Sequence, residues 1–156
     1  MRRWVAVATL VAAAVASTLA RQVLSQDRTA VVAAYTVVGD QIPYLLSGNP
    51  GDTGRGRRIL VDREIGNCLA CHKVAETGEP FQGDLGPDLG NIGRRLTAGQ
   101  IRFRLVDLSR LNPTTLMPPY HRVEGLTRVA TKYADNPVLT AQEIEDVVAY
   151  LTTLRQ

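Results

Sequence analysis

The sequence predicts a small, mostly α-helical domain that follows an irregular N-terminal extension. Two stretches, 97–111 and 140–154, each begin with a capping threonine and continue with apolar residues at helical spacing. Stretches rich in glycine and proline lie before and between them, and this composition favours loops. A length of 156 residues allows one modest domain with additional segments, which we place at 53–156.

Residues 1–20 have the features of a secretory signal peptide. A pair of arginines begins the segment, an apolar run over residues 4–16 follows, and small residues suited to cleavage lie at its end. The alternative is an uncleaved anchor helix, which requires about 20 apolar residues. Because the apolar run is shorter and contains a threonine, we predict export with cleavage near Ala16 or Ala20.

Residues 21–52 form the predicted extension. Its second part, 35–52, contains two prolines and three glycines and predicts an irregular extended segment rather than a core helix. A small domain does not need such a segment, so one interpretation is a surface for a partner protein. The other is a segment laid across the domain itself.

The domain begins with a predicted helix from Thr53, capped by Asp52 or Thr53 and ending before Gly66 and Asn67. Its expected apolar face consists of Ile59, Leu60 and Ile65.

The run Cys68-Leu69-Ala70-Cys71-His72 is the attachment signature of a c-type haem. Two thiols separated by two residues match the two vinyl groups of the porphyrin, and the next histidine is placed to bind the iron as its proximal ligand. A structural zinc site needs about four ligands, whereas the chain has no other cysteine and one other histidine. A dithiol redox pair lacks a neighbouring βαβ pattern, and a disulfide would close a small, strained loop. We therefore predict one covalent haem c.

Residues 76–93, after this run, are rich in glycine, proline and aspartate and predict a loop that covers the haem. A helix should then begin behind Thr97, whose capping box includes Gln100, and stop at Asn112 and Pro113. Its expected buried stripe is Ile101, Leu105 and Leu108, with Arg102 and Arg104 pointing elsewhere.

The final helix has the clearest signals. Thr140 and Glu143 form a capping box, and acidic residues at 143, 145 and 146 suit the positive end of the helix dipole. Its expected core face consists of Ile144, Val147, Val148, Leu151 and Leu154.

Met117 is the predicted second axial ligand of the iron. It lies 45 residues after His72, in a loop that two following prolines hold extended. A thioether favours ferrous iron, so histidine–methionine ligation suits reversible electron transfer at high potential. A methionine can also simply fill a core. Two further alternatives are ligation by His121, which would give a lower potential, and five-coordinate iron open to ligands.

Several long stretches resemble the SoxX family, the monohaem c-type cytochrome subunit of the sulfur-oxidising SoxAX complex. They are VVGDQIP, GNPGD, GNCLACH, RLVDLSRLNPTTLMPPYH, VEGLTRVA and TAQEIEDVVAYL, and together they cover roughly residues 35–155. The resemblance implies a class I cytochrome c fold, in which the final helix crosses the first helix beside the haem. It also implies that the carbonyl of Pro87 accepts the second N–H of the His72 ring.

The resemblance further implies a periplasmic heterodimer with a SoxA-like haem subunit. That complex, an L-cysteine S-thiosulfotransferase, joins thiosulfate to a cysteine of a SoxYZ-like carrier, and the electrons pass to a small acceptor cytochrome. Because both cysteines of this chain are used for haem attachment, we expect no catalytic residue in it. The alternatives are a free periplasmic electron carrier and a peroxidase-like or gas-binding haem protein.

The charge balance gives no support to a nucleic-acid partner. The net charge of +3 falls to +1 without residues 1–20, which carry two arginines and no acid. Two ionised haem propionates would bring it near −1. A basic surface for phosphates is therefore not expected.

Overall fold

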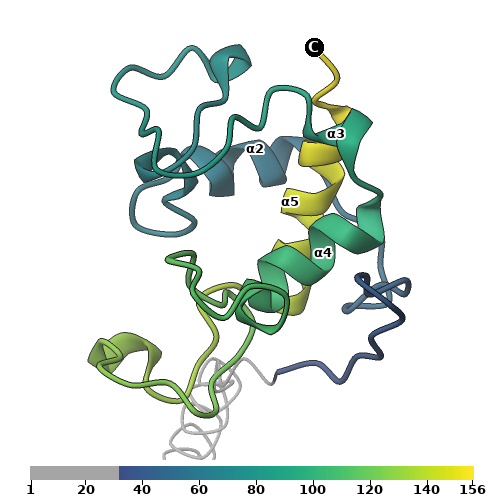
Figure 1. The fold of residues 1–156 in the computed structure, drawn as a ribbon, viewed down its shortest axis with the longest axis vertical. Coiled ribbons are helices and arrows are strands. Elements are labelled where there is room, and N and C mark those ends of the chain that lie inside the picture. The colour runs from purple at the N-terminus through teal and green to yellow at the C-terminus, as the bar shows by residue number, and fades with distance from the viewer. Residues whose placement is uncertain (1–31) are drawn as a thin grey trace, which may run out of the picture.

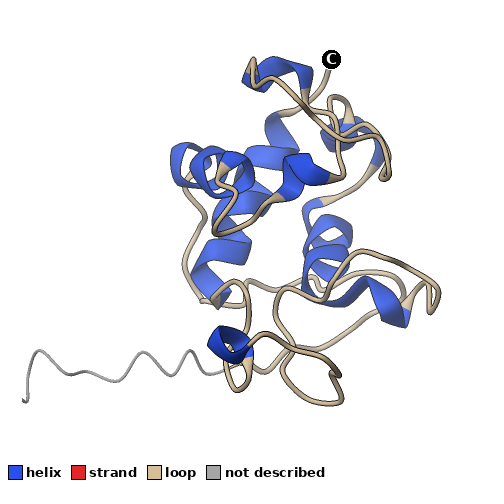
Figure 2. Ribbon diagram, turned by 90° about the vertical axis from the view of Figure 1, so that its left-hand side faces the viewer, coloured by secondary structure: helices blue, strands red, loops and turns tan. Residues whose placement is uncertain are grey.

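The computed structural model describes residues 32–156, and in this range the backbone is helical with long connecting loops (Figures 1 and 2). The α-helices are α2 (Thr53–Val61), α3 (Ile92–Arg95), α4 (Ala98–Asp107) and α5 (Ala141–Thr153). Short 3-10 turns lie at Cys68–Ala70, Ala75–Thr77, Leu108–Arg110 and Thr131–Tyr133. Residues 32–156 contain no strand beyond an isolated bridge between Val38 and Gln41. The mostly α fold class is confirmed.

The predicted signal peptide lies outside the described residues. Within residues 32–156, no helix has the length and apolar character needed to cross a membrane.

Both predicted capping boxes are present. The Thr97 hydroxyl accepts from the Gln100 N–H at 3.3 Å, and the Gln100 side chain accepts from the Thr97 N–H at 2.9 Å. At the start of α5, the Thr140 N–H donates to Glu143 at 2.8 Å. These reciprocal bonds satisfy N–H groups that have no partner within the helix, and so fix where α4 and α5 begin.

Two predicted helix ends were wrong. α2 stops at Val61, because the Asp62 carboxylate accepts from the N–H groups of Glu64 and Ile65 at 2.7 and 3.2 Å and forms a turn. Ile65 therefore lies outside the helix and is 40% exposed instead of joining the apolar face. α4 ends at Asp107 rather than at Asn112, and a 3-10 turn follows.

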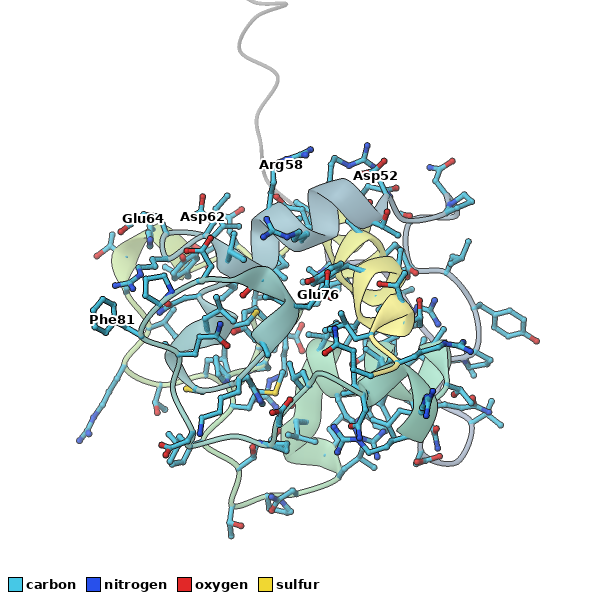
Figure 3. The ribbon with its side chains drawn as sticks, turned by 90° about the horizontal axis from the view of Figure 1, so that it is seen from above. Asp52, Arg58, Asp62, Glu64, Glu76 and Phe81 are labelled. Atoms are coloured by element: carbon cyan, nitrogen blue, oxygen red, sulfur yellow. The ribbon has the colours of Figure 1, made fainter. Side chains whose placement is uncertain are left out.

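Helix α2 crosses α5, as the family resemblance implied (Figure 1). The two helices approach so closely that a Cβ at Gly56 would overlap the backbone of Asp146. Arg55 of α2 donates to both oxygens of Asp146 at 2.7 and 2.9 Å. Figure 3 shows Asp52, the N-cap of α2, above the yellow ribbon of α5. The Asp52 N–H also donates to Asp146, at 2.8 Å.

Residues 33–52, which we call the arm, run beside α4 and α5 without regular structure (Figure 1). A buried ion pair between Arg102 of α4 and Glu145 of α5 holds the arm. Arg102 donates to the carbonyl of Ile42 at 2.7 Å, and Glu145 accepts from the N–H of Leu46 at 2.9 Å. The structure thus lays the arm across its own domain.

This arrangement corrects the expectation for Arg102, which does not point away from the core. Glu145 and Asp146 lie near the start of α5, where the helix dipole favours acidic residues, and they also form ion pairs. All three are buried, and each has an opposite charge within hydrogen-bonding distance. Pairing removes much of the penalty of burying a charge.

Candidate haem-binding site

A cavity of about 550 Å³ lies between the Cys68–His72 run and the loop that contains Met117. The structure brings all five predicted site residues to its wall, namely Cys68, Cys71, His72, Pro87 and Met117. Apolar side chains from α4, α5 and the neighbouring segments complete much of the lining. They include Leu60, Leu89, Ile101, Leu105, Val147 and Leu151.

The two cysteines lie on a tight turn that begins behind Asn67, a residue in the left-handed region with φ 49°. The N–H of His72 donates to the Cys68 carbonyl at 3.0 Å, so the turn holds the histidine next to both thiols. The cysteines are not joined by a disulfide. Burial raises the pKa of the Cys68 thiol to about 11. A dithiol redox pair works through a lowered thiolate pKa, so this site has the opposite property.

The ring of His72 is oriented by the loop that follows it. Its Nδ1 lies 2.8 Å from the carbonyl oxygen of Pro87, which is the hydrogen bond implied by the resemblance. A carbonyl only accepts, so Nδ1 carries the proton and Nε2 keeps its lone pair. This is the tautomer that a metal ligand needs, and the hydrogen bond also fixes the orientation of the ring.

Glycine is required at position 86 for this contact. A Cβ at Gly86 would overlap the imidazole of His72. Backbone hydrogen bonds join the loop to the haem motif before and at this point: Gly83 N–H donates to the Leu69 carbonyl at 2.8 Å, and Gly86 N–H donates to the Cys71 carbonyl at 2.7 Å. The loop therefore supports the ring through its backbone, which explains its abundance of small residues.

Met117 faces the same cavity as His72, whereas His121 does not line it. The ring of His121 is fully buried, with Nδ1 2.8 Å from the Leu139 carbonyl and Nε2 accepting from the Ala33 N–H at 2.9 Å. Both of its nitrogens thus have protein partners. Of the two candidate axial ligands, the structure brings Met117 to the site.

The charges on the cavity wall fit a ligand that carries carboxylates. Among the described lining residues, the charged side chains besides the titratable His72 are Arg95 and Arg104, and none is acidic. A haem is a largely apolar disc with two propionates on the side opposite its vinyl groups, so an apolar cavity with two cysteines and two arginines fits it. Sequence reasoning missed both arginines. The helical spacing of Arg104, three residues after Ile101 and four before Leu108, was the signal that could have placed it on the cavity face.

Tyr120 is a second residue that sequence reasoning missed. It lines the cavity and donates from its hydroxyl to the Gly66 carbonyl at 2.8 Å. Burial, together with the neighbouring Cys68, raises the pKa of its phenol, so the hydroxyl stays protonated and remains a donor. The bond ties the loop after Met117 to Gly66, two residues before the haem motif.

The described part of the chain contains no set of ligands for the alternative of a zinc site. No three side chains of histidine, cysteine, aspartate or glutamate gather there.

Comparison with known proteins identifies the family and supports the fold. The family model described as cytochrome c matches residues 54–155. Among solved structures, the crystal structure of SoxXA from P. pantotrophus is similar, with a TM-score of 0.72 and 32% sequence identity. The similarity covers 78% of this chain and 95% of that chain. The comparison with curated proteins gave no match.

Proposed function

Because this chain belongs to the cytochrome c family as a SoxX-like member, we propose that it is the electron-transfer subunit of a periplasmic thiosulfate-oxidising complex. The family implies covalently bound haem c. One observation carries the proposal: a single cavity has the Cys68–His72 run on its wall together with Met117. That arrangement supports one haem with two protein axial ligands and no open iron position.

In this proposal, Cys68 and Cys71 would form the thioethers, and His72 and Met117 would bind the iron. The haem would supply a reversible one-electron couple. The protein fixes the His72 ring through Pro87 and excludes water with its apolar wall, and Arg95 and Arg104 on that wall could pair with the propionates. A ligand set that stays in place during reduction suits electron transfer, whereas substrate activation requires an open site.

The proposed partner is a SoxA-like haem subunit, because the similar solved structure is a SoxXA complex. Joining thiosulfate to a thiolate of a SoxYZ-like carrier forms one S–S bond and releases two electrons. The chain has two cysteines, both of them in the haem motif, so it offers no additional thiol for that chemistry. We assign the bond formation to the partner, and to this chain the passage of electrons to a small acceptor cytochrome.

An exposed aromatic side chain outside the cavity supports contact with a redox partner. Phe81, in the loop after the haem motif, is 89% exposed and projects away from the domain (Figure 3). Aromatic rings contribute a large apolar area to protein interfaces, so Phe81 is the side chain that we propose to contact the partner.

Reconstitution tests this function. The isolated chain should not be reduced by thiosulfate, and it should not modify the carrier. With the SoxA-like subunit and the carrier added, thiosulfate should become attached to the carrier, detected by mass spectrometry, while an added cytochrome is reduced. The matched control omits only this chain. Equal electron transfer without the chain would contradict the proposal.

A free electron carrier is the second candidate, favoured by the position of the arm. Its polar anchors all lie within its own domain, so it does not need a partner subunit in order to be placed. Affinity purification from the source periplasm distinguishes the two candidates. Recovery with a second protein that carries covalent haem supports the subunit role, and recovery as a monomer supports the free carrier.

A further inference from the structure

We infer that His121 is a positioning residue for Met117, and that the start of the arm supports the iron ligand through it. The inference rests on the proposed function, since it assumes that Met117 binds the iron. It assigns a role to two features that electron transfer itself does not explain: a fully buried histidine outside the cavity, and an N-terminal segment that returns to the Met117 loop.

His121 joins three segments that are distant in the sequence, one through its backbone and two through its imidazole ring. Its own backbone N–H donates to the Val106 carbonyl at 3.3 Å, near the end of α4. Nδ1 lies 2.8 Å from the carbonyl of Leu139, just before α5, and must be the donor because a carbonyl only accepts. Nε2 accepts from the N–H of Ala33 at 2.9 Å. The buried ring is neutral and fully hydrogen-bonded in this arrangement.

The connection from His121 to Met117 is short and stiff. Pro118 and Pro119 follow Met117 directly, and each fixes its own φ and restricts the residue before it. Tyr120 comes next; its N–H donates to the Leu105 carbonyl at 3.1 Å, and its carbonyl accepts from Leu139 at 2.9 Å. Because the backbone between them has little freedom, a displacement of Tyr120 and His121 also displaces Met117.

Within the described residues, the N–H of Ala33 is the donor to Nε2 of His121. Loss of this N–H therefore leaves a buried ring nitrogen without a protein partner. A buried polar atom without a partner is costly, and the ring is expected to shift to find one. The rest of the arm does not depend on this bond, because Ile42 and Leu46 have their own anchors on Arg102 and Glu145. The bond can therefore be removed without detaching the arm.

Proline substitution at position 33 removes the N–H while leaving the arm's other anchors intact. The matched control is Ala34→Pro, since the N–H of Ala34 donates to no residue in the described range. Two measurements on the ferric full-length holoprotein report on the ligand: the far-red sulfur-to-iron absorption band, and the rate at which cyanide replaces the methionine. Global stability is followed in parallel by circular dichroism in urea.

We expect Ala33→Pro to bind cyanide about tenfold faster than the wild type, because the loss of one hydrogen bond to a buried group is large enough to cause a change of this size. Ala34→Pro should stay near the wild-type rate. At the ring itself, His121→Gln, which can still donate and accept, should keep a slower rate than His121→Leu. This rescue separates positioning from general packing.

Unchanged cyanide binding in Ala33→Pro, in a protein whose far-red band is intact, would overturn the inference and leave the proposed ligand set standing. Equal acceleration in both proline variants would also overturn it, because the effect would then come from stiffening the arm. A wild-type protein without the far-red band would overturn the ligand set itself, and the inference with it.

Discussion

Arg102 and Glu145 form a two-point ion pair between α4 and α5, with N–O distances of 2.7 and 2.8 Å. Their side chains are 3% and 1% exposed. The pair also binds the arm, through the carbonyl of Ile42 and the N–H of Leu46. Two helices and the arm are therefore held by one buried charge pair.

Removing one partner of this pair should be more damaging than removing both. Arg102→Met leaves the Glu145 carboxylate buried without its counter-charge, which costs about 3–5 kcal/mol in the free energy of unfolding. The double variant Arg102→Met/Glu145→Met should recover part of that loss. Urea unfolding measures both, with Asp40→Asn as the control: Asp40 is half-exposed, and its 3.5 Å pair with Arg104 should contribute less than about 1 kcal/mol. A double variant less stable than Arg102→Met would contradict this account.

Asp146 should make the α2–α5 contact sensitive to acid. Burial disfavours its charged form, but hydrogen bonds from Arg55, from the Asp52 N–H and from Gln142 together hold its pKa below the ordinary 3.8. A lowered pKa in the folded state means that the contribution is complete above pH 3.8 and is lost as the pH falls through the folded-state value. The free energy of unfolding, measured from pH 5 downward, should fall more steeply in the wild type than in Asp146→Asn. Parallel pH profiles would show that other groups cause the loss.

Met117→Ala should abolish the far-red sulfur-to-iron band and lower the reduction potential, because the thioether that favours ferrous iron is lost. Leu111→Ala is the matched control. Leu111 lies between α4 and Met117, is 38% exposed and does not line the cavity, so its truncation should leave the band in place. A band that survives Met117→Ala but disappears in His121→Ala would transfer the ligand role to His121.

The two arginines on the cavity wall should raise the reduction potential. A positive charge near the haem favours the reduced form, because the reduced haem carries one positive charge less than the oxidised haem. The low dielectric of the site strengthens this effect. Replacing Arg95 or Arg104 by glutamine should therefore lower the potential measured by redox titration. Arg58→Gln serves as the control, because Arg58 projects from α2 toward solvent (Figure 3) and does not line the cavity. An equal change in Arg58→Gln would indicate a general effect of surface charge.

Local signals in the sequence predicted the parts of the fold that local interactions determine. Thr97 and Thr140 cap their helices with partners three residues away, so the whole interaction is visible in a short window. The haem motif is equally compact. Ile65 was misplaced because the helix pattern took no account of the Asp62 side chain, which competes for the backbone N–H groups.

Pairings between distant segments could not be predicted in this way. Arg102 was expected to point away from the buried stripe because its partner, Glu145, is 43 residues away and was interpreted only as an acidic residue near a helix start. The roles of Arg95, Arg104 and Tyr120 depend on which segments meet around the cavity. Such residues become recognisable once the packing of α4 and α5 is known, since charge and spacing alone fit several arrangements.

The anchors of the arm also determine the order in which the molecule can be assembled. The hydrogen-bond partner of Leu46 is Glu145, 99 residues later in the chain, and that of Asp52 is Asp146, 94 residues later. A chain made from its N-terminus has therefore exposed both haem-motif cysteines well before α5 exists. Val147 and Leu151 of that helix form part of the cavity wall. The last helix therefore completes the cavity wall and also supplies the anchors of Leu46 and Asp52, whereas the start of the arm is held by His121 and by α4.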